Sequence, residues 1–65
     1  MQEYMIECKN GKRLDICLKL LFGAGIKPRI SFRELDDHKI IYQVIFSTEQ
    51  PLYEELLRRY KLLIG

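Results

Sequence analysis

Five consecutive residues form the strongest candidate for a binding site in this sequence: Lys9, Asn10, Gly11, Lys12 and Arg13. Apolar residues alternate with polar ones before this segment and recur with helical spacing after it, so we expect it to join the end of a strand to the start of a helix. The first turn of a helix leaves backbone N–H groups free, and its dipole favours an anion. The segment therefore predicts a site for a small anionic ligand. The alternative is a tight turn whose cations serve only solubility.

No other group of residues predicts chemistry. The single histidine, His38, stands beside Asp36 and Asp37 in a polar segment, and no serine or cysteine lies at a spacing known from catalytic sites. Cys8 and Cys17 do not form a C-x-x-C pair, and a zinc site built from them and His38 would need a fourth ligand. We expect two reduced, buried thiols that fill the core, and no enzyme activity, metal site or cofactor.

The size and charge of the chain limit what it can be. It has 65 residues and a formal net charge of +2, which predicts one domain, residues 1–65, with a small core. Basic residues exceed acidic ones only before residue 40, so a nucleic-acid partner is an alternative and not the leading expectation. Acidic residues interrupt the N-terminal segment where a signal peptide would be apolar, and no stretch approaches the roughly 20 apolar residues that span a bilayer. These observations predict a cytoplasmic protein without a membrane partner.

The hydrophobic periodicity predicts five elements. Alternation gives strands over residues 3–9, 29–35 and 40–46, and spacings of three and four give helices over residues 12–23 and 50–64. A right-handed crossover would place the first two strands in parallel, with the third, antiparallel strand between them. The expected class is α+β in the order β-α-β-β-α, with a three-stranded sheet and both helices on one face. This is a truncated ferredoxin-like fold, without the last strand, and it leaves the outer edge of the first strand unpaired.

The last helix carries two local signals. Ser47 or Thr48 can cap its first turn, where Pro51 costs little because its missing N–H would be unpaired anyway. On the solvent side, acidic residues precede arginines by four positions, which predicts two ion pairs: Glu54–Arg58 and Glu55–Arg59.

Residues 4–46 resemble the first two-thirds of ACT-type regulatory domains: a strand, a glycine turn, a helix that ends in Ala24-Gly25-Ile26, and a hairpin. ACT domains bind amino acids or other small effectors, usually at an interface between paired modules. The resemblance implies a regulatory module whose ligand loop lies at the turn containing Gly11.

The expected open face of the sheet carries an apolar centre. Met5, Ile41 and Ile45 lie there among polar residues, as in protein-interaction patches. In the first helix, Ile16 and Leu20 lie off the stripe that faces the sheet, so the apolar arc is wider than one sheet needs. Ordinary burial beneath the second helix is the alternative for these two residues. The open face also lacks aromatic rings on which RNA bases could stack, which places nucleic-acid binding behind protein contact.

The unpaired edge of the first strand predicts self-association. Two first strands could pair antiparallel about Ile6 into one six-stranded sheet, with Glu3 of one copy near Lys9 of the other. We therefore expect a small non-enzymatic interaction or regulatory module that forms a homodimer or binds another protein. A small inhibitor or adaptor of a larger protein is equally compatible with these residues.

Overall fold

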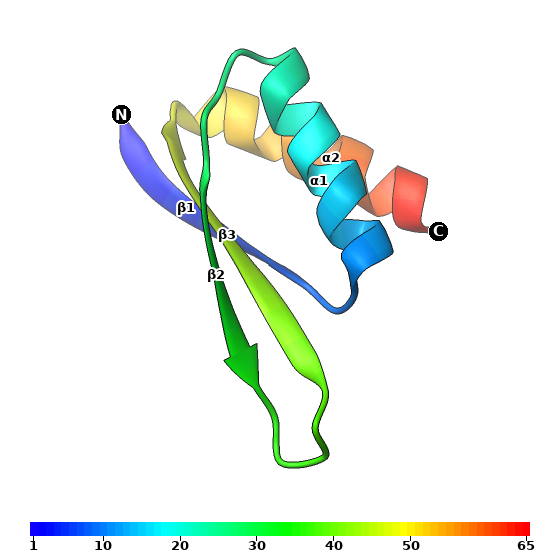
Figure 1. Cartoon of the computed structure of the whole chain (residues 1–65). Coiled ribbons are helices and arrows are strands. Elements are labelled where there is room, and N and C mark those ends of the chain that lie inside the picture. Colours follow the sequence, from blue (N-terminus) through cyan, green and yellow to red (C-terminus); the bar gives the residue numbers. More distant parts are fainter.

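The structure is a computed structural model that describes all 65 residues. Its elements follow the predicted order, with boundaries within two residues of those expected from periodicity. They are β1 (Gln2–Cys8), α1 (Gly11–Gly23), β2 (Arg29–Glu34), β3 (Ile40–Thr48) and α2 (Gln50–Ile64), as Figure 1 shows. The α+β class is confirmed.

The sheet has the order β1-β3-β2, with β3 antiparallel to both of its neighbours. Its register places Tyr4 opposite Phe46 and Ile6 opposite Val44, and on the other side Ile30 also lies opposite Val44. The predicted central position of the third strand is therefore confirmed. The arrangement is compatible with a truncated ferredoxin-like fold. It leaves the outer edge of β1 without a strand partner in this chain.

Both helices contribute to one small core on one side of the sheet. Its buried members are Ile6, Cys8, Cys17, Leu21, Val44, Phe46, Leu56 and Tyr60. Two contacts place α2 over β1: the Tyr53 ring stacks on Tyr4 with centroids 3.9 Å apart, and the Tyr60 hydroxyl donates to Cys8 Sγ at 3.6 Å. The helix α2 therefore covers the edge strand β1 from Tyr4 to Cys8.

The opposite edge strand, β2, has no such cover. No residue of β2 is buried, although Ile30 and Phe32 lie on the same side of the sheet as the core residue Val44. Their side chains are 49% and 71% exposed. Figure 1 shows the far part of the β2–β3 hairpin continuing past the end of the helices. Ile30, however, lies opposite the buried Val44, so its exposure shows that the helices cover β3 without reaching β2. The expectation that two helices would cover one face of the sheet holds for β1 and β3 but is wrong for β2.

Capping residues set the start and the end of α1. The Asn10 side chain accepts a hydrogen bond from the Arg13 N–H at 2.9 Å, which satisfies one of the free donors of the first turn. At the other end, Gly25 takes the left-handed conformation with φ 76°, which glycine adopts without steric cost. This turn allows the Ile26 N–H to donate to the Leu21 carbonyl, and it ends the helix.

The start of α2 differs from the prediction. Its N-cap is Glu49, whose side chain makes no capping hydrogen bond, while Thr48 is buried as the last residue of β3. Pro51 does lie in the first turn, as expected. Thr48 cannot cap the helix because the strand continues through it and the helix begins two residues later.

Of the two ion pairs predicted on α2, Glu55–Arg59 forms and Glu54–Arg58 does not. Glu55 accepts hydrogen bonds from both Arg58 (2.7 Å) and Arg59 (3.0 Å), and these bonds, above all that of Arg58, lower the pKa of its carboxyl group. Glu54 instead accepts a hydrogen bond from Gln50 at 3.3 Å, so the predicted pair with Arg58 does not form.

Candidate functional site

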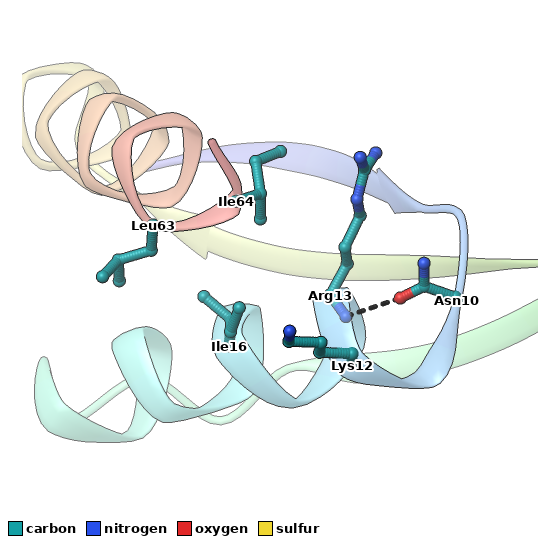
Figure 2. A pocket seen from close by; sticks show the side chains of 6 residues that line it. All are labelled: Asn10, Lys12, Arg13, Ile16, Leu63 and Ile64. Atoms are coloured by element: carbon teal, nitrogen blue, oxygen red, sulfur yellow. Dashed lines mark hydrogen bonds between the residues drawn. The ribbon is translucent and has the colours of Figure 1, made fainter.

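A pocket of about 240 Å³ opens where the start of α1 meets the end of α2. Figure 2 shows its lining, which comes from the loop before α1, from α1 itself and from the last turn of α2. The residues are Asn10, Lys12, Arg13, Ile16, Leu63 and Ile64. The pocket combines two cationic side chains with an apolar wall.

The structure brings together three of the five residues predicted for the ligand site, namely Asn10, Lys12 and Arg13. Gly11 is the first residue of α1 and does not line the pocket. Lys9 lines a different hollow, of about 440 Å³, beside Lys39 and Ile40 at the start of β3. The predicted segment is therefore divided between two surfaces, because the chain turns sharply between β1 and α1.

The donors available to an anion in this pocket are fewer than the sequence suggests. The Arg13 N–H already donates to the Asn10 side chain, and the Leu14 N–H donates to the backbone carbonyl of Asn10 at 3.0 Å. Only the N–H groups of Gly11 and Lys12 remain free in the first turn. The Lys12 and Arg13 side chains form no ion pair within the chain, but Figure 2 shows them running in different directions. The pocket can attract an anion without clamping it.

The residues predicted for protein contact occupy three environments. Met5 is 46% exposed and lies directly opposite the half-buried Ile45 on the open face, so these two form one patch. Ile41 is half-buried on the same face, opposite Arg33, and lines the hollow that contains Lys9. Ile16 and Leu20 are half-buried and line hollows shared with α2, which favours burial beneath that helix as the reason for their apolar character. The Ile6 side chain belongs to the core, so only its backbone is available at the sheet edge.

Three further apolar side chains are exposed that were not predicted to be so from the sequence. They are Phe22 at the end of α1, and Ile30 and Phe32 on the same side of β2. Ile30 and Phe32 alternate with the polar residues of β2 and lie on the helix side of the sheet, where burial would be expected. Only the position of the helices, which leaves β2 uncovered, makes these side chains accessible.

Three buried side chains that can ionise come from three different elements. Cys8 of β1, Cys17 of α1 and Tyr60 of α2 are all buried, and both thiols are free, as predicted. Burial and the neighbouring Cys8 raise the pKa of Cys17 from 9.0 to about 12. A thiol with such a pKa is a poor nucleophile at neutral pH. We interpret the cluster as part of the core.

The remaining chemical groups do not converge on a site. His38 lies in the β2–β3 turn with φ 65°, and its Nδ1 atom is 3.4 Å from the Glu34 carboxylate, where both side chains are mostly exposed. No three His, Cys, Asp or Glu side chains are arranged to hold a metal ion. Neither α1 nor α2 has the length and apolar content needed to cross a bilayer.

Comparison of the chain with protein-family models, with curated proteins and with solved structures returns no match. The resemblance to ACT-type domains therefore gains support only for the coarse topology of the sheet and helices.

Proposed function

We propose that the chain is a small protein-interaction module that binds an extended segment of a partner at the outer edge of β1. The observation that carries this proposal is the position of β1 in the sheet: it pairs only with β3, so its other edge presents unpaired backbone N–H and C=O groups along seven residues. Such an edge is a template for strand addition, a common mode of peptide recognition.

Two further features of β1 suit it to this role. The helix α2 stands over the strand through the Tyr4–Tyr53 stack, so an added strand would lie beside a helix and not in open solvent. The exposed side chains on the open face of β1 are Glu3, Met5 and Glu7, so an apolar residue lies between two acidic ones. Charged residues on an edge oppose indiscriminate pairing and leave specific, charge-matched pairing possible.

Hydrogen exchange of the β1 amides tests this proposal. In the unbound chain, alternate amides along β1 should be protected by pairing with β3, while the others exchange rapidly. Extended peptides selected from a random display library on the folded chain should slow exchange at the unprotected set. Peptides that bind while leaving these amides unchanged would contradict the proposal, as would a selection that yields no binder.

A small anionic ligand at the pocket of Asn10, Lys12 and Arg13 is the second candidate function. The unpaired Lys12 and Arg13 side chains support it. Titration with inorganic phosphate should shift the amide signals of Gly11 and Lys12, and the double variant Lys12→Gln/Arg13→Gln should lose these shifts. Equal shifts in the variant, or none in either protein, would remove this candidate.

A further inference from the structure

The two edges of the sheet carry opposite charges at the same spacing. On the open face, β1 displays Glu3 and Glu7, four residues apart. On that same face, β2 displays Arg29 and Arg33, also four residues apart. Within one copy, Arg29 Nη2 reaches Glu3 Oε2 at 2.7 Å, and both side chains stay mostly exposed. The remaining pair, Glu7 and Arg33, forms no ion pair within the chain.

We infer that the partner of the β1 edge is the β2 edge of a second copy of this chain, joined in parallel. This inference rests on the interaction function proposed above and names its partner. In one register, Glu3 lies beside Arg29 of the second copy and Glu7 beside Arg33 of the second copy, with Met5 near Ser31 between them. A shift by two residues along the strand leaves neither of these two charge pairs adjacent, so charge selects the register.

The helix side of the two edges is complementary as well. The same register places Tyr4 near Ile30 of the second copy and Ile6 near Phe32 of the second copy. In one copy these β2 side chains are exposed because no helix covers β2, whereas β1 has α2 above it. Joining the two edges brings the uncovered strand of one copy next to the covered strand of another. The exposed Ile30 and Phe32 side chains then lose water contact, which favours association.

A two-fold pairing of β1 with β1 fits the structure less well. The strand ends at Cys8, and antiparallel pairing over its full length would place Glu3 opposite Glu7 in both halves of the interface. The register that avoids this repulsion sets Glu3 against Lys9, which lies outside the strand. Parallel joining of β1 to β2 repeats in one direction, so the assembly always has a free β1 edge at one end and a free β2 edge at the other, and its growth is open-ended.

A charge-exchange experiment tests the inference. Sedimentation at about 1 mM, where weak interfaces are populated, should show wild-type mass above the monomer value of 7.8 kDa and rising with concentration. E3R/E7R makes both edges basic, and R29E/R33E makes both edges acidic, so each variant alone should remain monomeric. An equimolar mixture should regain the wild-type mass, because every basic edge then meets an acidic one.

Each outcome of this experiment decides the question. Circular dichroism matching the wild type should first confirm that both variants fold; because all four side chains are exposed, we expect that they do. The inference is overturned by a monomeric wild type, by assembly of R29E/R33E alone, or by a mixture that stays monomeric. Assembly of R29E/R33E with loss in E3R/E7R would indicate the β1–β1 pair instead. Peptide binding at β1 by a monomeric wild type would reject the second copy as partner and retain the proposed function.

Discussion

Raising the pH from 9 towards 12 is expected to lower the free energy of unfolding by on the order of 1 kcal/mol per pH unit, because the Cys17 thiol loses its proton more readily in the unfolded chain than in the folded protein. Burial raises the pKa of this thiol from its ordinary 9.0 to about 12, so the folded protein holds the proton more tightly than the unfolded chain does. The stabilisation is fully present below pH 9 and is lost as the pH approaches 12. Burial, and secondly the hydrogen bond to Cys8, also raises the pKa of the Tyr60 hydroxyl. Its ionisation therefore also lowers the free energy of unfolding as the pH rises.

This loss is large for a protein of this size, since a domain below about 70–80 residues has only about 3–5 kcal/mol of stability. Urea unfolding at a series of pH values measures the effect, and Cys17→Ala is the matched variant. The variant starts from lower stability because it leaves a small cavity, but the slope of its free energy against pH should be shallower. An equal slope in wild type and variant would show that Cys17 does not carry the dependence.

Replacing Tyr60 by alanine is expected to lower the free energy of unfolding by about 3–5 kcal/mol, enough to unfold most of the protein at 25 °C. The Tyr60 ring is buried among residues of all the covered elements, and its hydroxyl is hydrogen-bonded to Cys8. Tyr60→Phe keeps the ring and should cost only about 0.5–1.5 kcal/mol, the usual value of one hydrogen bond. Chemical denaturation followed by circular dichroism measures both changes.

Leu62→Ala is the matched control for Tyr60→Ala. Leu62 belongs to the same helix but is 69% exposed, so its truncation should change the free energy of unfolding by no more than about 0.5 kcal/mol. A loss at Leu62 comparable to that at Tyr60 would mean that the outer face of α2 is buried in solution.

The element order and the sides of the sheet to which side chains point were predictable because both depend on local periodicity. Alternation along β1 and β3 identified which side chains face the helices, and the burial of Ile6, Val44 and Phe46 agrees with it. The exposure of Phe32 was not predictable in this way. It depends on where the helices dock across the sheet, which is a property of the tertiary contacts and not of the β2 sequence.

The candidate pocket likewise combines residues that the local sequence predicts with residues that only the tertiary structure brings in. Asn10, Lys12 and Arg13 were predicted from their place between a strand and a helix. The apolar wall formed by Leu63 and Ile64 comes from the other end of the chain, and no local pattern connects these residues to the loop. Similarly, Thr48 has the chemistry of a helix cap, but its position in β3 removes it from that role.

The strand order also has a consequence for the sequence of folding events. The β2–β3 ladder joins neighbouring segments through a short turn, whereas the β1–β3 ladder joins the N-terminal strand to a segment that follows α1 and β2 in the chain. Because closing the longer loop costs more entropy, we expect the hairpin to form early and β1 to dock late, after the helices have condensed beside it. Until then the edge of β3 that β1 will occupy remains open to other strands. The newly made chain is therefore most prone to non-native pairing before its own N-terminal strand arrives.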